Sequence, residues 1–143
     1  MNHINSPDTS DSATERQIQA KGKTAPRITH ADLQANIASE HYFNAADAIY
    51  LERAHRREHD KSPLQLLTFC VLVLKNGFVV TGESACASPE NFDAEIGRSI
   101  ARQNAEQKIW PLMGYELKTE LSRPVLSEAD SLADMAGTPR PAN

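Results

Sequence analysis

The sequence predicts an α+β fold, in which a small antiparallel sheet is built on a central hairpin and a long helix packs on it. Three observations carry this prediction. The dipeptide Asn76-Gly77 separates two runs of strand-forming residues, and residues 88–90 read Ser-Pro-Glu, a common helix start. Apolar and charged residues alternate over residues 115–121, as they do in a strand with one exposed face. The expected order of elements is α-β-β-α-β.

Length and composition bound the domain organisation. The chain has 143 residues, of which 40% are hydrophobic, and this is enough for one small domain. Residues 1–27 hold few large apolar side chains, and residues 122–143 scatter theirs among Pro, Gly and charged residues. Both segments are therefore expected to be disordered tails, which leaves a single α+β domain over residues 28–121.

Charge and apolar pattern exclude several classes of function. A net charge of −4 does not supply the basic surface of a general nucleic-acid coating protein, so no nucleic-acid polymer is expected as a partner. The strongly apolar run over residues 69–74 is too short to span a bilayer, and the first residues lack the features of a signal peptide. The protein is therefore expected in the cytoplasm, without a membrane partner.

The first element is expected to be a helix that begins at Thr29. Thr29 followed three residues later by Asp32 has the form of a capping box, with Asp in place of the usual Glu. Leu33 and Ile37 lie one turn apart on one face. The helix is predicted to continue to about Tyr42 and to dock on the sheet by this narrow stripe.

The turn sets the register of the hairpin. Asn-Gly is the preferred dipeptide of a two-residue type I′ turn, which pairs Lys75 with Phe78 and places Cys70 opposite Glu83. Because Cys86 then does not face Cys70, two free thiols in a reducing compartment are expected. The first strand is apolar on both faces, which predicts a helix on one face and a second helix or a second subunit on the other. A homo-oligomer is expected.

The second helix is expected to begin at Ser88, with Pro at its first position and Glu near the positive end of its dipole. Apolar residues recur at helical spacing over residues 92–109. Pro111 and Gly114 are predicted to end the helix before the last strand.

One apparent enzyme motif is present. Residues 55–59 read His-Arg-Arg-Glu-His, the arrangement of inverted zinc proteases. Such a site needs a well-formed helix beside a cleft and a third ligand, whereas this motif lies in a long charged run that is typical of a solvated loop. Nucleophile elbow, phosphate-binding glycine loop and CxxC pair are all absent from the sequence, so no enzymatic activity, metal or cofactor is expected.

Two arginines form a small basic stripe. Arg98 and Arg102 lie one helical turn apart and could clamp phosphate groups. Glu95 and Glu106 are placed to neutralise them by pairing at spacings of three and four residues. On the residues alone, the neutralised stripe is the stronger interpretation.

Two further side chains have alternative interpretations. Glu83 could line a pocket or an interface, or it could be a charged strand end that reaches solvent. Phe78 could stack on a base, or it could pack across the strand pair on Lys75. The structural interpretation is again the stronger one for each.

Three stretches of the domain resemble a known family. They are residues 35–43, 66–86 and 88–117, which read ANIASEHYF, LLTFCVLVLKNGFVVTGESAC and SPENFDAEIGRSIARQNAEQKIWPLMGYEL. Together they resemble the small tailed-phage protein family named after gene forty-nine of coliphage N-four and gene sixty-six of a Shigella phage. The two tails and residues 53–61 fall outside this resemblance. The family in turn resembles the type-one Thoeris anti-defence proteins, which bind cyclic ADP-ribose signals, and in some cases cyclic oligonucleotides, without cleaving them.

This resemblance implies a counter-defence function in the cytoplasm of a bacterial host. An oligomer with pockets between subunits would sequester a cyclic nucleotide signal. From the chemistry of such a ligand, the expected binding residues are Phe78, Glu83, Asn91, Arg98 and Arg102. The alternative is inhibition of a host protein by direct binding through the apolar hairpin face around Leu72 and Leu74.

Overall fold

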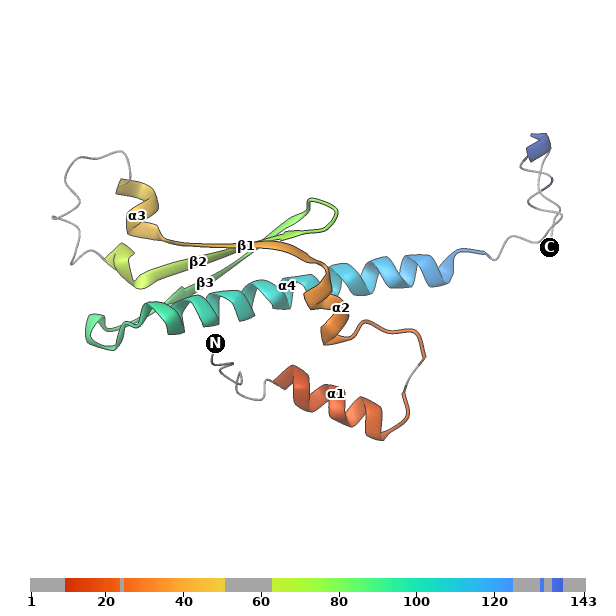
Figure 1. Cartoon of the computed structure of the whole chain (residues 1–143), viewed down its shortest axis with the longest axis horizontal. Helices are drawn as coiled ribbons and strands as arrows, with labels where there is room; N and C mark the ends of the chain where they lie inside the picture. Colours follow the sequence, from red (N-terminus) through yellow and green to blue (C-terminus); the bar gives the residue numbers. More distant parts are fainter. Residues whose placement is uncertain (1–9, 24, 51–62, 125–131, 133–134, 138–143) are drawn as a thin grey trace, which may run out of the picture.

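The computed structural model describes residues 10–23, 25–50, 63–124, 132 and 135–137. It confirms the α+β class, because a three-stranded antiparallel sheet lies against one long helix (Figure 1). This helix, α4, spans Ala94–Ser122, and its C-terminal part extends beyond the sheet. Within the described ranges, no helix is long and apolar enough to cross a membrane.

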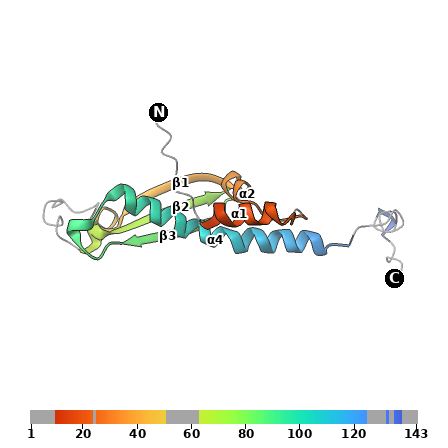
Figure 2. The same cartoon turned by 90° about the horizontal axis from the view of Figure 1, so that it is seen from below.

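The sheet has the strand order β1-β2-β3, with β1 at Ile37–Asn44, β2 at Leu67–Leu74 and β3 at Val79–Ala85. Both pairs of neighbours are antiparallel. Along the central strand β2, buried and half-buried residues alternate, which agrees with its apolar character on both faces. A view turned by 90° shows α4 running along the strands (Figure 2).

Strand β1 is the largest difference from the sequence prediction, which has a helix through Tyr42. The helix α2 spans only His30–Ala35. Its capping box is confirmed: Asp32 N donates to Thr29 Oγ1 at 3.1 Å, and Thr29 N donates to Asp32 Oδ2 at 2.9 Å. After the C-cap Asn36 the chain pairs with β2, because pairing with an apolar central strand satisfies the backbone more fully than a short, narrow-striped helix does.

The hairpin between β2 and β3 forms as predicted, but its register differs by one residue. Gly77 N donates to Leu74 O at 2.9 Å, and Leu74 N donates to Phe78 O at 2.8 Å, so residues 75–77 make a three-residue loop. Gly77 has a φ of 87°, the left-handed conformation that such a loop requires at its last position. The Asn-Gly signal marks the turn correctly but not its length.

This shift turns β3 over relative to the predicted register. Cys70 pairs with Gly82, while Glu83 pairs with Phe69 on the other face of the sheet. The predicted position of Glu83 opposite Cys70 is therefore wrong. A Cβ atom on Gly82 would lie 2.2 Å from Ala101 O of α4, so only glycine allows the helix to approach this closely.

The helix α4 begins later and ends later than predicted. Asp93 caps it, with Oδ1 accepting from Ile96 N at 2.9 Å, and the short 3-10 turn η3 at Pro89–Asn91 precedes it. The helix continues past Pro111, and the strand predicted over residues 115–121 is therefore wrong.

The continuation past Pro111 has a physical cause. A proline removes one helical N–H donor, and Pro111 is exposed, where water can satisfy the carbonyl that loses its partner. The residues that follow are mostly good helix formers such as Leu, Met, Glu and Lys. Their alternation of apolar and charged residues lies on an exposed helix.

The hydrophobic core lies between the sheet and α4. It includes Leu72 and Leu74, whose hairpin face was the surface expected to bind a host protein. Both side chains are buried, so that surface is not open to a partner. The buried cluster consists of Leu33, Cys70, Leu72, Leu74, Val80, Ala101, Ala105 and Ile109.

The sheet face opposite α4 also carries apolar side chains. Phe43 and Phe69 stack with their ring centroids 5.0 Å apart. Phe43 is 40% exposed and Val79 is 48% exposed. We call this surface the open face; its apolar residues are Phe43, Phe69, Val71, Val73 and Val79. The cover expected for it, a second helix or a second subunit, stays a prediction.

The remaining described elements are short. Helix α1, Ser10–Ala20, lies where the sequence predicts a disordered tail, and Arg27 holds it through two hydrogen bonds of 2.7 Å to the Glu15 carboxylate. Helix α3, Ala45–Tyr50, and the 3-10 turn η2, Pro63–Leu66, lie at the far end of the sheet from the hairpin loop (Figure 1). The His-rich motif of residues 55–59 and most of residues 122–143 lie outside the described residues.

Candidate functional site

A hollow of about 330 Å³ lies where the end of β1 meets the start of α4. We call it the Arg98 hollow. Three aromatic rings, an arginine, a carboxylate and several hydrogen-bonding groups line it. The lining residues are Tyr42, Phe43, Asn44, Asp47, Gln65, Thr68, Phe92, Ala94 and Arg98.

Local sequence explains how this hollow forms. The Asp93 cap fixes the first residue of α4, and one turn later Gly97 packs against β2, where an added Cβ would lie 3.0 Å from Thr68 Oγ1. This close contact brings the start of the helix beside the end of β1 and the start of β2. On the other side, Asn44 donates to Gln65 O and accepts from Ala46 N, which ties β1 to η2 and α3.

Arg98 is the cation of this hollow. Within the described part of the chain, no hydrogen bond or ion pair engages its side chain, although Glu95 was predicted to pair with it. It lies in the second turn of α4, where the helix macrodipole is positive. The guanidinium is therefore available to an anion.

Tyr42 also lines the hollow, and its hydroxyl group lies near Cys70 and Arg102. Burial and the neighbouring Cys70 raise the pKa of Tyr42 to about 12. The hydroxyl is consequently protonated at any physiological pH and can donate a hydrogen bond. Burial likewise raises the pKa of the Cys70 thiol, which makes it a poor nucleophile.

Arg102, one turn further along α4, is fully engaged inside the protein. Its Nε donates to Glu40 Oε2 at 2.8 Å, its Nη2 donates to Gln34 Oε1 at 3.0 Å, and it forms an ion pair with Glu106. The predicted pairing with Glu106 is confirmed. Gln34 Nε2 also donates to Glu106 Oε1 at 3.0 Å, so this cluster ties α2, β1 and α4 together. Arg102 serves the fold.

The other predicted ligand residues lie apart from the Arg98 hollow. Glu83 is exposed on the open face, where its backbone carbonyl accepts from Asn104 Nδ2 at 2.8 Å. Asn91 is exposed in the 3-10 turn before α4. Phe78 lies at the hairpin loop, beside the C-terminal half of α4. At about 1.5 Å of rise per residue, the stretch of α4 from Arg98 to Leu112 alone is about 21 Å long. The five residues therefore do not form one site.

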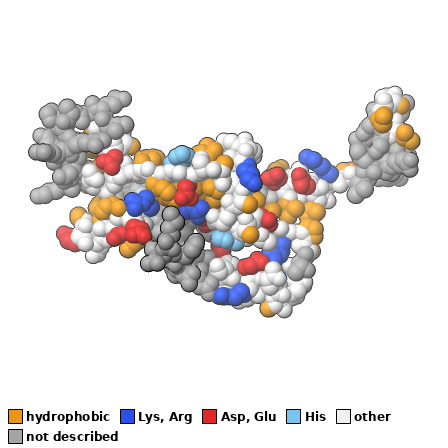
Figure 3. All heavy atoms as spheres, in the orientation of Figure 1, with side chains coloured by type: hydrophobic (Ala, Val, Ile, Leu, Met, Phe, Trp, Pro, Cys, Tyr) orange, Lys and Arg blue, Asp and Glu red, His pale blue; other side chains and the backbone are white. Residues whose placement is uncertain are grey.

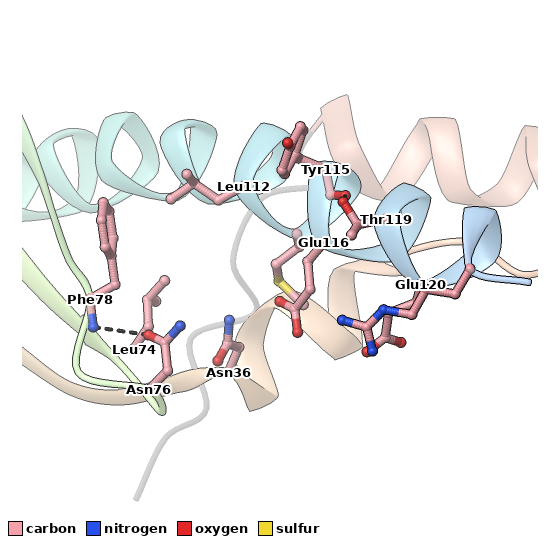
Figure 4. A pocket seen from close by; sticks show the side chains of 11 residues that line it. Asn36, Leu74, Asn76, Phe78, Leu112, Tyr115, Glu116, Thr119 and Glu120 are labelled. Carbon is pink, nitrogen blue, oxygen red and sulfur yellow. Dashed lines mark hydrogen bonds between the residues drawn. The ribbon is translucent and has the colours of Figure 1, made fainter. Parts of the chain in front are cut away.

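A second hollow, of about 410 Å³, lies between the hairpin loop and the C-terminal half of α4. We call it the hairpin hollow. Phe78 rises from the hairpin toward α4, and Leu112 and Tyr115 project from the helix around the same space (Figure 4). Its lining residues are Asn36, Leu74, Asn76, Phe78, Leu112, Met113, Tyr115, Glu116, Thr119, Glu120 and Arg123.

Comparison with known proteins assigns the chain to a protein family. The model of the Phage protein (N4 Gp49/phage Sf6 gene 66) family matches residues 28–121. The chain belongs to this phage protein family. No curated protein and no solved structure matches it. The Arg98 hollow lies wholly within the matched residues of this phage protein, whereas α1 lies outside them.

Of the residues that line the Arg98 hollow of this phage protein, the sequence prediction includes Arg98 but none of the three aromatic residues. Tyr42 and Phe43 were assigned to a helix end, which hid their alternation across the two sides of an edge strand. Phe92 was assigned to the apolar face of the helix. The signal that could have found them is strand-like: Tyr42 and Phe43 directly precede Asn44, a typical strand-ending residue. Among the described residues, no group of three or more His, Cys, Asp and Glu side chains could hold a metal ion.

Proposed function

We propose that this phage protein binds and sequesters an anionic cyclic nucleotide signal of its host, a cyclic ADP-ribose or a cyclic oligonucleotide, without cleaving it. The Arg98 hollow is the proposed binding site. The observation that carries the proposal is the Arg98 guanidinium at a hollow with aromatic walls, where no described residue pairs with it. Sequestration needs binding affinity and no catalytic residue. By keeping the signal from its effector in the host, the protein would act in counter-defence.

The groups of the hollow match the parts of such a ligand. A phosphate group accepts from the Arg98 guanidinium and is favoured by the positive end of α4. An aromatic ring such as Phe92 or Phe43 offers a face on which a base stacks. The Asp47 carboxylate can accept hydrogen bonds from ribose hydroxyls, and the Tyr42 hydroxyl can donate to an oxygen.

The size and position of the hollow favour an oligomer. About 330 Å³ is at the lower end of small-molecule pockets, so one subunit would leave part of a dinucleotide-sized ligand in water. Phe43 lines the hollow and also belongs to the open face. We propose that a second copy of this chain covers the open face and thereby narrows the hollow around the ligand.

The test uses the full-length protein with cyclic ADP-ribose isomers and cyclic trinucleotides. A bound ligand should raise the melting temperature, and heat denaturation should then release the same ligand unchanged in mass. Arg98→Ala should weaken binding at least tenfold, because it removes the charge-assisted bond to phosphate. Arg123→Ala is the matched control, since it removes an arginine from the far end of α4.

Two outcomes would contradict the proposal. The first is the absence of a thermal shift and of recovered nucleotide with every compound of the panel. The second is recovery of a cleaved product, which would make the protein an enzyme. Equal binding by Arg98→Ala and the unaltered protein would instead remove the Arg98 hollow as the site.

A further inference from the structure

The hairpin hollow gathers large apolar side chains at the surface. Tyr115 is 77% exposed, Phe78 is 53% exposed and Leu112 is 39% exposed, and all three line the same space. Beneath them lies Leu74, which is buried and forms part of the core. Contiguous exposed aromatic and aliphatic residues over a concave surface are typical of a binding site for a partner.

The charged side chains of this hollow are two glutamates and one arginine, so acidic groups are in excess. Glu116 and Glu120 lie one turn apart on α4, and within the described residues neither carboxylate forms an ion pair or a side-chain hydrogen bond. They lie in the C-terminal half of the helix, whose end carries the negative pole of the macrodipole. Acidic side chains are visible where α4 passes the hairpin (Figure 3). Arg123 is the cation of the lining, and no ion pair joins it to either glutamate.

We infer that the hairpin hollow is a docking site for a cationic amphipathic segment of a partner protein. One apolar side chain of that segment would enter between Phe78, Leu112 and Tyr115. A Lys or Arg one turn away would pair with Glu116 and Glu120 and lie against the Tyr115 ring. This inference is independent of the nucleotide proposal, because it uses the other end of α4.

The chemistry of the hollow argues for a protein segment over other ligands. The Glu116 and Glu120 carboxylates, which outnumber the one cation of the lining, repel a nucleotide or an anionic membrane surface. A small polycation would satisfy the carboxylates but would leave the aromatic and aliphatic side chains exposed to water. A peptide with both an apolar anchor and a cation satisfies both parts of the surface.

The experiment is a titration of the uniformly ¹⁵N-labelled full-length protein, followed by amide chemical shifts. The probes are an amphipathic Leu/Lys peptide of fourteen residues, the same peptide with Glu in place of Lys, spermidine, and vesicles of phosphatidylglycerol. We expect the Leu/Lys peptide to shift the amides of residues 76–78 and 112–120 and to bind at least tenfold more tightly than the Glu peptide.

Variants sharpen this result. The double variant Glu116→Gln with Glu120→Gln should lower the affinity for the Leu/Lys peptide at least tenfold. Tyr115→Ala should lower this affinity by a similar factor. Because all three side chains are exposed, the variants should fold normally. The matched control is Glu90→Gln with Glu95→Gln, which neutralises two exposed carboxylates near the start of α4.

Three results would overturn the inference. They are equal binding of the Lys and Glu peptides, peptide shifts that map away from the hairpin hollow, and binding of spermidine or vesicles that matches the peptide. The absence of any shift with the Leu/Lys peptide at millimolar concentration would also overturn it.

Discussion

The two hollows of this phage protein lie at opposite ends of one helix and differ in charge. The Arg98 hollow is at the start of α4 and presents, among aromatic rings, a guanidinium that pairs with none of the described residues. The hairpin hollow is beside the C-terminal half of α4 and presents, among apolar side chains, two carboxylates without an ion pair in the described part of the chain. Arg98 near the N-terminal end of the helix and the two glutamates near its C-terminal end each have the same sign as the nearby pole of the helix, although Asp47 and Arg123 add one opposite charge to each hollow.

This difference shows how a single long helix can give a small domain two distinct surfaces. Like charges at each pole are unfavourable for the isolated helix, since a cation is better placed at the C-terminus and an anion at the N-terminus. Side chains that oppose the dipole do not stabilise the helix, which favours a role in binding. An anionic ligand at one end and a cationic ligand at the other would each be attracted by both the side chain and the helix.

The largest effect is expected from a substitution that displaces α4, the helix that lines both hollows. Gly82→Ala places a Cβ within 2.2 Å of Ala101 O and 2.3 Å of Ala105 N, so α4 cannot keep its position on the sheet. We expect a loss of about 3 kcal/mol in the free energy of unfolding. Urea denaturation followed by circular dichroism measures this loss.

The matched control is a second glycine, Gly114, which lies in α4 itself. Around Gly114 an added Cβ meets nothing within 4 Å. Gly114→Ala should therefore raise the free energy of unfolding by about 1 kcal/mol, since alanine is the better helix former. Equal stability of the two alanine variants would contradict the close packing of β3 on α4.

The fold could be predicted in outline because its strongest signals are local. The Asn76-Gly77 turn, the Thr29 cap and the apolar strand over residues 67–74 are all encoded by adjacent residues. The hairpin register could not be predicted, because it depends on Gly82 meeting α4, a contact between distant parts of the chain. Strand β1 was missed for the same reason, since its partner lies beyond residue 66.

The candidate site shows the same division. The identity of Arg98 as a cation on a helix could be predicted, but whether it was paired could not. Arg98 and Arg102 are equivalent in the sequence, one turn apart. Their contacts differ because Gln34, Glu40 and Glu106, which come from three elements, lie around Arg102.

The two arginines should differ in how much they contribute to the stability of the fold. Arg102→Ala removes the arginine that pairs with the buried Glu106, and we expect it to lower the free energy of unfolding by about 2 kcal/mol. Arg98→Ala should change it by less than about 0.5 kcal/mol, because the described structure gives Arg98 no partner to lose.

Denaturation of both arginine variants in the same buffer, with the unaltered protein beside them, makes this comparison. A ligand-binding assay completes it: Arg98→Ala should lose affinity for the nucleotide, while the folded fraction of Arg102→Ala should retain it. Reversal of this order, with Arg98→Ala the less stable protein, would show that Arg98 serves the fold and that the Arg98 hollow is not a site.

A smaller effect tests whether the two hollows act independently. Arg98→Ala should leave the affinity for the Leu/Lys peptide within about twofold, and Glu116→Gln with Glu120→Gln should leave nucleotide affinity within the same range. At about 21 Å of helix between them, exposed charges interact weakly at physiological salt. Isothermal titration of each variant with both ligands measures this. A tenfold change in the ligand affinity of the hollow that does not carry the substitution would show that the two hollows are energetically coupled.

The smallest expected effect concerns α1, which lies beside the middle of α4 and borders neither hollow. Hydrogen bonds from Arg27 lower the pKa of Glu15 from 4.5 to about 2. A lowered pKa in the folded state stabilises α1 above pH 4.5, and this contribution disappears as the pH falls from 4.5 toward 2. We expect the amide shifts of residues 10–20 to move over this range, and Glu15→Gln to abolish the change. If peptide binding at the hairpin hollow followed the same titration in the unaltered protein but not in Glu15→Gln, α1 would control that surface, and the contrast between the two ends of α4 would not be a property of the helix alone.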